Sequence, residues 1–344
     1  MSRQINRSKD HIKISVLMPI YNASAYLRQS LDSVTGQTLA DIEIICINDG
    51  STDNSLEIIR EYAGKDNRIV VIDKSNSGYG DSMNHGLDIA KGKYIAILEP
   101  DDWYETGMLK ALYDLATQNN LDVIKCDFYQ YSNQTNQNKQ YHLFKPSQCN
   151  KVISNDEDNF IYSLQPSIWS AIYKQNFLIK NSIRFLDTPG ASYQDTSFNF
   201  KVFALAKRVM FINTPLIHYR IDNKQSSINN IAKKLPNIDK EYDEIDKFII
   251  NNKLSDRLGK TAVTCRYRTY LWAMEQLPNN EIVRFCLIAS RKLKESGKKM
   301  KISDKELPKQ CAQLMNRRRL YTIKKLIRLN IHRIKFKLVM KEQL

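Results

Sequence analysis

The stretch that decides the fold is Tyr94–Glu105, YIAILEPDDWYE. Its first five residues are apolar or aromatic and suit a buried β-strand. Glu99, Asp101 and Asp102 follow directly, grouped around Pro100. Carboxylates held close together repel one another unless a cation or another partner offsets their charge. The stretch therefore predicts a buried strand that delivers three carboxylates to one edge of a sheet.

Strand and helix patterns alternate around this stretch, through the first 130 residues. Strands are expected at 14–18, 42–47, 69–72, 94–98 and 121–128, and helices at 23–34, 54–62, 81–90 and 106–118. Strands separated by helices of this length predict βαβ units in an α/β fold, with a mostly parallel sheet flanked by helices. Ligands of such sheets bind at the carboxyl ends of the strands, where the acidic stretch lies.

The rest of the chain divides less clearly. Residues 131–160 are polar and rich in Asn, Gln and Ser, which predicts an exposed loop or a boundary. A helical pattern begins near Ile238, just past Pro236. We therefore expect an α/β domain over residues 1–230 and a helical C-terminal region over residues 231–344.

Charge is concentrated at the C-terminus. Of the 52 Lys+Arg and 37 Asp+Glu residues in the chain, residues 291–344 hold 18 and 4, so the remaining 290 residues are close to neutral. A neutral body with a basic tail is not the pattern of a general nucleic-acid binder.

Within this tail, apolar residues recur at three- and four-residue steps. They are Leu320, Ile323, Ile327, Ile331, Ile334 and Leu338. Basic residues surround them, so residues 316–341 are expected to form a basic amphipathic helix that lies on an anionic membrane surface. The alternative is a helix whose apolar face docks on the catalytic domain.

Cysteine usage and hydropathy indicate the compartment. The six cysteines are scattered, without the spacing of a structural zinc site, as expected of reduced cysteines in a cytoplasmic protein. The N-terminus is polar and lacks the apolar core of a secretory signal, and no apolar run approaches the roughly 20 residues of a membrane helix. We expect a cytoplasmic protein held peripherally at the inner face of the cell membrane by its tail.

The acidic stretch is the first candidate site. Mg²⁺ and Mn²⁺ prefer oxygen ligands and are commonly held by one or two carboxylates together with substrate phosphates. An acidic turn that caps the following helix explains the same spacing equally well.

Two further strand ends carry polar residues. Asn48–Asp53, NDGSTD, follows the second strand, and Asp49 could accept hydrogen bonds from a nucleobase or ribose, whereas a simple Asx–Gly turn is the alternative. Pro19–Asn22, PIYN, follows the first strand, and Tyr21 could pack on a base. The G-x-G-x-x-G of a dinucleotide-binding domain is absent here, which argues against NAD and FAD.

In order along the chain, ISVLMPIYNASAYLRQSLDSV, IEIICINDGSTDNSLEII and NSGYGDSMNHGLDIAKGKYIAILEPDDW resemble the family 2 glycosyltransferases, which have a GT-A fold. The resemblance is close over residues 12–130 and looser to about residue 230. It implies a nucleotide-sugar half over 12–130 and an acceptor half over 131–230. It also implies an enzyme of polysaccharide biosynthesis that uses a UDP-sugar donor and Mn²⁺ or Mg²⁺ and inverts the anomeric carbon of a hexose. The acceptor would be a glycan or a lipid-linked glycan.

The resemblance assigns donor contacts after the first, second and fourth strands. These positions are Pro19, Tyr21, Asn22, Asp49, Glu99, Asp101 and Asp102. Asp101 would face the metal and the diphosphate. Glu99 stands where the family more often has Asp.

On the acceptor side, Thr188–Phe203, TPGASYQDTSFNFKVF, is a Pro-Gly loop that leads into a helix. The resemblance implies that Asp195 is the general base of the inverting reaction, with Gln194 in place of a usual acid. Chemically, one carboxylate must take the proton of the attacking acceptor hydroxyl. A helix cap is the alternative role of Asp195.

Further candidates come from His218-Tyr219-Arg220 and two tryptophans. Arg220 is expected to clamp the diphosphate and His218 to assist the metal. Trp103 and Trp169 are candidate platforms for an acceptor sugar, or core residues.

Two other functions remain open at the level of sequence. A nucleotidyltransferase also combines a βαβ sheet with acidic metal ligands, but it usually carries a Gly-rich basic loop where this chain has PIYNASAYL. A catalytically degenerate nucleotide-sugar-binding protein is the other alternative, suggested by Glu99 and Gln194.

Overall fold

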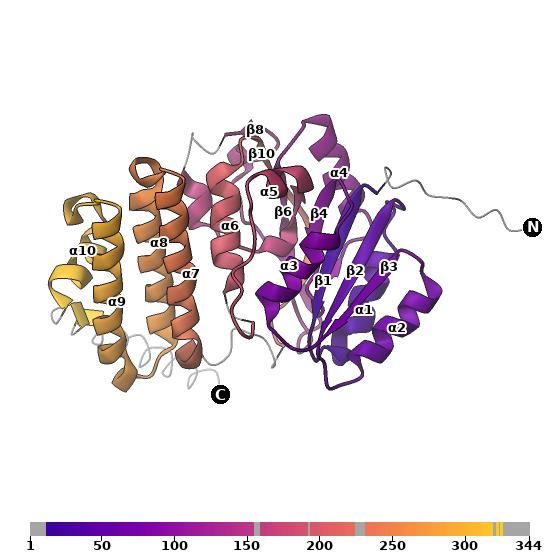
Figure 1. Cartoon of the computed structure of the whole chain (residues 1–344), viewed down its shortest axis with the longest axis horizontal. Coiled ribbons are helices and arrows are strands. Elements are labelled where there is room, and N and C mark those ends of the chain that lie inside the picture. The colour runs from indigo at the N-terminus through magenta and orange to yellow at the C-terminus, as the bar shows by residue number, and fades with distance from the viewer. Residues whose placement is uncertain are drawn as a thin grey trace, which may run out of the picture. The chain divides into compact units, whose positions relative to one another are not determined.

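The computed structural model describes residues 12–154, 159–191, 193–223, 231–318, 321–322 and 324–325. The chain forms two compact units, Met1–Ser227 and Ile228–Leu344. The first is an α/β unit and the second is helical (Figure 1).

The α/β unit is built on one sheet. Its described strands are β1 (Ile14–Ile20), β2 (Ile42–Asp49), β3 (Ile69–Lys74), β4 (Tyr94–Ile97), β5 (Trp103–Tyr104), β6 (Val123–Ser132), β7 (Gln137–Tyr141), β8 (Val152–Ile153), β9 (Ala171–Lys174) and β10 (Val209–Arg220). They are ordered β3-β2-β1-β4-β9-β6-β10-β5, with β7 paired to β6 and β8 paired to β10.

Strands β1 to β4 pair in parallel, and β6 and β10 form another parallel pair beyond β9. All residues of β1, β2 and β4 are buried, which explains why these strands read as continuous apolar runs rather than alternating ones. The flanking helices are α1 (Ser24–Thr35), α2 (Ser55–Lys65), α3 (Tyr79–Ile89) and α4 (Met108–Gln118). The chain moves outward from β1 to β3 and then returns to β4 beside β1, so the sheet has a switch point between β1 and β4 (Figure 1). The predicted α/β fold with flanking helices is confirmed.

Beyond β4 the sheet differs from the sequence prediction. The expected fifth strand is β6, but β9 lies between it and β4 and pairs antiparallel with both. Residues 131–160 are not only a loop, because β6 runs on to Ser132 and both β7 and β8 fall in this range. Every residue of β7 is exposed, so no apolar alternation marks this strand, which forms by pairing with β6.

Short elements complete this unit. They are the 3₁₀ turns η2 (Pro146–Gln148), η3 (Asn159–Ser163) and η4 (Ile168–Ser170), and the helices α5 (Gln175–Lys180) and α6 (Gln194–Leu205). Helix α6 is buried along most of its length, and Phe198 stacks on Phe185 with ring centroids 4.1 Å apart. This packing fixes the first turn of α6, where Asp195 lies.

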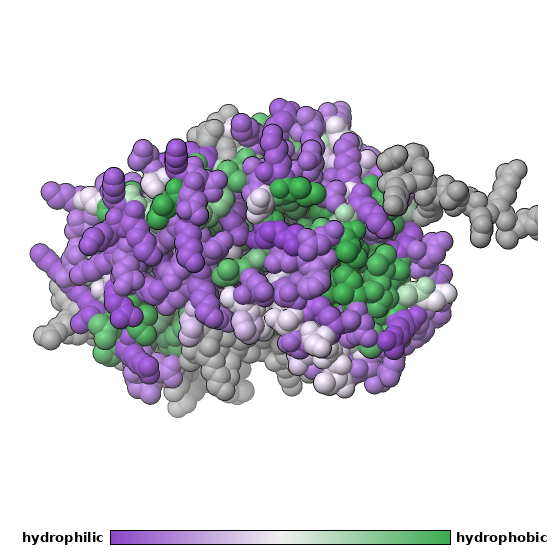
Figure 2. All heavy atoms as spheres, viewed as in Figure 1, coloured by the Kyte–Doolittle hydropathy of each residue, from purple (hydrophilic) through white to green (hydrophobic). Residues whose placement is uncertain are grey.

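Figure 2 shows one face of the molecule, which is largely hydrophilic. On the α/β unit, apolar residues gather over the β2–β3 end of the sheet. Strand β3 is the edge strand there and is mostly half-buried, in contrast to β1 and β2.

The helical unit contains α7 (Ile231–Asn251), α8 (Ser255–Gln276), α9 (Asn279–Lys299), η5 (Asp304–Glu306) and α10 (Lys309–Asn316). Helix α7 begins before Pro236 and includes it, whereas the sequence prediction placed the helical start after this residue. Pro236 is the sixth residue of this helix and has no backbone N–H, so its position lacks one intrahelical hydrogen bond although the helix runs through it. Buried Arg266 of α8 forms ion pairs with three α7 aspartates, at 2.8 to 3.4 Å.

The predicted amphipathic tail falls mostly outside the described residues, and so do its six apolar positions. Of its described part, Tyr321 is buried and its hydroxyl lies 3.2 Å from that of Tyr267 in α8. Lys325 pairs with Glu275 of α8 at 3.0 Å. The described start of the tail thus contacts the helical unit. Among the described helices, none is both long enough and apolar enough to cross a membrane.

Candidate active site

The carboxyl ends of β1, β2 and β4 meet at one edge of the sheet, beside the switch point. The loops after β1 and β2 are tied together there. Asn22 lies in a left-handed conformation (φ 50°), and its side-chain oxygen accepts a hydrogen bond from the backbone N–H of Thr52 at 2.7 Å. Pro19 is buried within β1, whereas Tyr21 is 53% exposed. Of these residues, Tyr21 is the side chain available to a ligand.

Asp49 organises the loop that leads into α3. Its two carboxylate oxygens accept hydrogen bonds from the backbone N–H groups of Ser77 and Gly78, both at 2.9 Å, and Lys74 donates to it as well. Asp49 is buried. Its carboxylate therefore shapes the 74–78 loop in this structure, and a nucleobase would share an oxygen that is already bonded.

The acidic segment after β4 holds three carboxyl groups with raised pKa values. Glu99 is half-buried and accepts a hydrogen bond from the Tyr79 hydroxyl at 2.7 Å, while burial raises its pKa to about 8. One oxygen of Asp101 accepts a hydrogen bond from the side-chain amide of Asn223 at 2.7 Å, and burial raises the pKa of this carboxyl group too. Each of these groups would gain from a cation nearby.

Asp102 is the most enclosed of the three. One oxygen accepts a hydrogen bond from the backbone N–H of Arg220 at 2.9 Å, and the other has no partner within the described residues. Burial, followed by the charge of Asp101, raises the pKa of Asp102 well above its ordinary value.

Arg220 holds the acidic segment in place. Its guanidinium donates to the backbone oxygen of Asp101 at 3.0 Å, to Gln29 at 2.7 Å and to Asn133. Three aromatic rings surround it at 4.6 to 5.1 Å, those of Tyr26, Trp103 and Tyr131. The residue is only 4% exposed. This geometry differs from the predicted diphosphate clamp, because all three guanidinium nitrogens have partners inside the protein.

Both ring nitrogens of His218 also have partners within the protein. Its ring nitrogens lie 2.8 Å from the side-chain oxygen of Asn138 and 2.7 Å from a carboxylate oxygen of Glu105. The ring is stacked between Trp103 and Tyr129, at 4.6 and 4.8 Å. The expected metal contact of His218 is therefore not what this geometry shows, since neither nitrogen is unpaired.

Asp195 is the second residue of α6 and is half-buried, and it does not cap the helix. Burial raises its pKa to about 6, although the charge of Lys125 opposes the shift. The charge of Asp195 also contributes to the raised pKa of Glu99, after burial and the charge of Asp101. Gln194 secures the preceding loop by donating to the Thr188 hydroxyl at 2.9 Å and to the Gly190 carbonyl at 3.0 Å.

The start of α3 joins the acidic segment to this loop, and the sequence analysis did not identify it. The backbone N–H of Tyr79 donates to the carbonyl of Gly190 at 3.1 Å, while its hydroxyl holds Glu99. A Cβ on Gly80 would lie 2.1 Å from the carbonyl oxygen of Leu186. Only glycine permits this close crossing. Tyr79 follows the end of β3, so its place after a third parallel strand was the signal that could have identified it.

The two candidate tryptophans lie in internal packing. Trp103 is stacked on His218 and lies under the guanidinium of Arg220. Trp169 is 7% exposed and its ring is parallel to that of Tyr219, at 4.9 Å and 8°. Neither ring is a bare platform.

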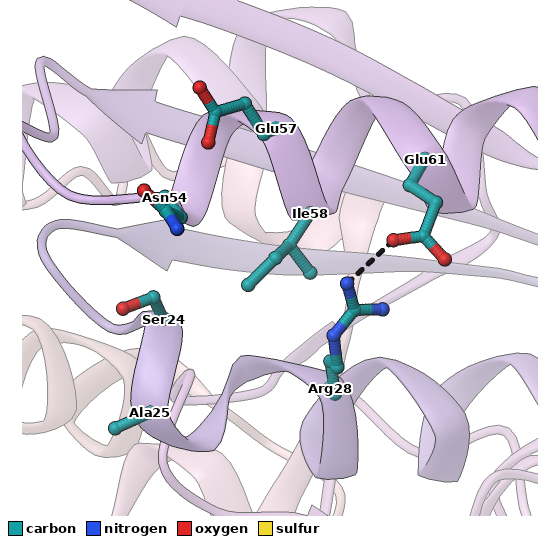
Figure 3. Close-up of a pocket in the computed structure, with 7 residues that line it drawn as sticks. All are labelled: Ser24, Ala25, Arg28, Asn54, Glu57, Ile58 and Glu61. Carbon is teal, nitrogen blue, oxygen red and sulfur yellow. Dashed lines mark hydrogen bonds and ion pairs between the residues drawn. The ribbon is translucent and has the colours of Figure 1, made fainter.

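A separate surface hollow lies between α1 and α2 (Figure 3). It is lined by Ser24, Ala25, Arg28, Asn54, Glu57, Ile58 and Glu61. Arg28 and Glu61 form an ion pair across it at 2.6 Å. None of the predicted site residues lines this hollow.

The carboxyl groups of the acidic segment suit a metal ion that takes most of its ligands from a bound substrate. Within the described residues, no group of three or more His, Cys, Asp or Glu is arranged to hold an ion. The unpartnered oxygen of Asp102 and the raised pKa values of its neighbours show a segment that a cation would stabilise. Mg²⁺ and Mn²⁺ often take one or two carboxylates and complete their shell with substrate phosphates.

The chain belongs to the glycosyl transferase family 2, whose family model matches residues 15–205. Among its relatives, the uncharacterized glycosyltransferase EpsJ of Bacillus subtilis is 34% identical over 221 residues, covering 60% of each protein. The glycosyltransferase GlyA of Streptococcus pneumoniae is 34% identical over 218 residues, which are 61% of this chain and 30% of that protein. The chain therefore spans less than two thirds of these relatives. The family resemblance of the sequence is confirmed.

Solved structures confirm the fold. The crystal structure of S. aureus TarS 1–349 in complex with UDP-GlcNAc superposes with a TM-score of 0.69 and covers 94% of this chain and 92% of that one. Its sequence is 18% identical, so the likeness concerns the fold alone.

The internal contacts of Arg220 predict a structural effect of its loss. Arg220→Met should lower the free energy of unfolding by about 3 kcal/mol, because it removes a buried charge that holds several buried polar groups. Arg208→Met is the matched control, since Arg208 also donates to a backbone carbonyl but is exposed. Its change should stay within about 0.5 kcal/mol. Urea unfolding of both variants measures the difference, and equal stabilities would contradict this role of Arg220.

Proposed function

We propose that the protein is an inverting glycosyltransferase that transfers a hexose from a UDP-sugar to a hydroxyl of a glycan or lipid-linked glycan. The observation that carries this proposal is the link made by Tyr79, whose hydroxyl donates to Glu99 at 2.7 Å and whose backbone N–H donates to the carbonyl of Gly190, in the loop before Asp195, at 3.1 Å. A donor-binding segment and a candidate base from distant parts of the sequence thus share one site. Catalysis is assigned to the α/β unit, residues 1–230 as the sequence predicts.

In the proposed reaction, the acceptor hydroxyl oxygen attacks the anomeric carbon of the donor. The new carbon–oxygen bond forms as the bond to the phosphate oxygen breaks, and its electron pair leaves with UDP. The proton of the acceptor hydroxyl passes to Asp195. A carboxylate with a pKa of about 6 is mostly ionised at neutral pH and is a stronger base than an ordinary aspartate.

The UDP-sugar donor would bind at the edge of the sheet where β1, β2 and β4 end. Asp101 would hold Mn²⁺ or Mg²⁺ together with the donor diphosphate, and such an ion offsets the charge that develops on departing UDP. Glu99 is oriented by Tyr79, and the segment is fixed by Arg220. Tyr21, which is 53% exposed, would pack on the uracil ring. TarS, which shares the fold, binds UDP and UDP-GlcNAc, which supports the choice of nucleotide.

The basic C-terminal region is proposed to hold the enzyme at an anionic membrane, where lipid-linked acceptors lie. Attraction to anionic lipid is worth about 1 kcal/mol for each basic residue near the surface.

Asp101→Asn should abolish metal-dependent donor binding. With wild type, UDP and MnCl₂ together should raise the melting temperature, and EDTA should remove the shift. The variant should show no shift and should lose at least about 100-fold in kcat/KM, because several kcal/mol of charge stabilisation depend on the ion. Asp114→Asn is the control, since Asp114 is exposed on α4 and its carboxylate pairs with exposed Lys110 at 2.5 Å. A full UDP shift in the Asp101 variant would exclude the metal assignment.

Asp195→Asn should reduce turnover by about 100-fold or more while leaving the UDP shift intact, because a base acts on the acceptor only. Asp187→Asn, an exposed carboxylate in the same loop, is the control. In wild type, kcat should fall as the pH falls through about 6, since Asp195 becomes protonated there. A rate that stays constant down to pH 5 would contradict the assignment.

Membrane binding is tested with the full chain and sedimented vesicles. Binding should occur with phosphatidylglycerol-containing vesicles at low salt and weaken as salt rises, since charge attraction is screened. Neutral phosphatidylcholine vesicles are the control. Equal binding to both, or to neither, would contradict the electrostatic anchor.

A further inference from the structure

Tyr219 stands between the two residues of β10 that sequence reasoning selected, yet it lies on the other face. Successive side chains of a strand point to opposite sides, so His218 and Arg220 share one face and Tyr219 takes the other. His218 and Arg220 are buried among Trp103, Tyr129 and Tyr131. Tyr219 is half-buried and packs on different rings.

One side of the Tyr219 ring rests on a rigid wall. The ring is parallel to that of Trp169 at 4.9 Å, and Phe128 meets it edge-on at 6.1 Å. Trp169 belongs to η4, and the turn before it is anchored because buried Lys125 donates to the carbonyls of Pro166, at 2.9 Å, and Ser167. Among the described residues, no ring stacks on the second face of Tyr219.

The Tyr219 hydroxyl is placed near both halves of the site. Within the described part of the chain it has no hydrogen-bond partner, and it is not sealed from solvent. Its pKa is raised, by burial first and then by the charges of Asp102, Asp101, Glu99 and Asp195. Tyr173 connects the turn behind this ring to α6, because its hydroxyl donates to the carbonyl of Ile168 at 2.9 Å and its ring meets Phe198 of α6 edge-on at 5.5 Å. The backbone also ties Tyr219 to the acidic segment, since the N–H of the next residue, Arg220, donates to Asp102 at 2.9 Å.

We propose that Tyr219, backed by Trp169, is the positioning residue that holds a pyranose ring of the acceptor between the acidic segment and Asp195. This inference rests on the proposed function. An aromatic face suits the apolar C–H face of a pyranose, and an unpaired phenol can hydrogen-bond a sugar hydroxyl. Tyr219 would thus hold the attacking hydroxyl over the donor, while the proton passes to Asp195 as described above.

The alternative is a purely structural aromatic, and kinetics separate the two. The full-length protein is given UDP-glucose, UDP-galactose or UDP-GlcNAc with MnCl₂, and UDP release is measured with and without p-nitrophenyl pyranosides as acceptor probes. In wild type, at least one p-nitrophenyl pyranoside should accelerate UDP release. Tyr219→Ala should raise the KM for that probe by at least about 10-fold, equivalent to roughly 1.4 kcal/mol.

In the same variant, the UDP-dependent thermal shift and the slow release of UDP without acceptor should be unchanged. Tyr219→Phe keeps the ring and its packing, so it tests the hydroxyl without a folding risk. It should weaken the acceptor by about 2- to 10-fold, the worth of one hydrogen bond. Tyr141→Ala is the matched control. Tyr141 is 37% exposed and stacks on the same Phe128 at 4.7 Å.

Three results would overturn the assignment. The first is an acceptor KM that is the same in wild type, Tyr219→Phe and Tyr219→Ala. The second is loss of the UDP shift in Tyr219→Phe, which would place the residue on the donor side. The third is a wild type that releases UDP but responds to no pyranoside. By contrast, a wild type with neither a UDP-dependent thermal shift nor UDP release would contradict the proposed glycosyltransferase function itself. The experiment therefore distinguishes a wrong role for Tyr219 from a wrong function for the protein.

Discussion

The burial of several like charges at the end of β4 is the constraint on which the rest of the site depends. Glu99, Asp101 and Asp102 lie within four consecutive residues, and Tyr79 links Glu99 to the loop that precedes Asp195. Each carboxyl group is partly removed from water. Glu99 accepts a hydrogen bond from Tyr79, Asp101 from Asn223, and Asp102 from the backbone N–H of Arg220. These bonds orient the groups but leave their pKa values raised. A cation bound together with a diphosphate would offset the negative charge of these carboxylates.

The buried guanidinium of Arg220 explains how such a segment stays in one conformation. It connects the acidic segment to Gln29 of α1 and to Asn133, which follows β6, inside a ring of aromatic side chains. A guanidinium can satisfy several planar partners at once, which a lysine ammonium cannot do. The sequence pattern predicts that Arg220 contacts the donor. In the structure its guanidinium instead packs behind the acidic segment and holds it in place.

Helix α3 explains how the acidic segment and the loop before Asp195 keep their spacing. Gly78 has φ +106°, and a Cβ on Gly78 or Gly80 would collide with the backbone of residues 186–190. The loop before Asp195 can cross the start of α3 only because both residues lack a side chain, and Tyr79 between them bonds to both sides. The distance from Asp195 to the acidic segment thus depends on backbone contact, which is less compliant than contact between long side chains.

The sequence by itself determined the parallel half of the sheet, the acidic segment and the location of the basic charge. Each of these depends on local information: continuous apolar runs, the residues that directly follow them, and composition. Tertiary structure decided the rest. The insertion of β9 between β4 and β6, and the exposed strand β7, follow from pairing between distant segments, which no local pattern records. The same holds for His218, Tyr219 and Arg220. The pairing register of a strand decides on which face of the sheet each side chain lies, and therefore which residues it contacts.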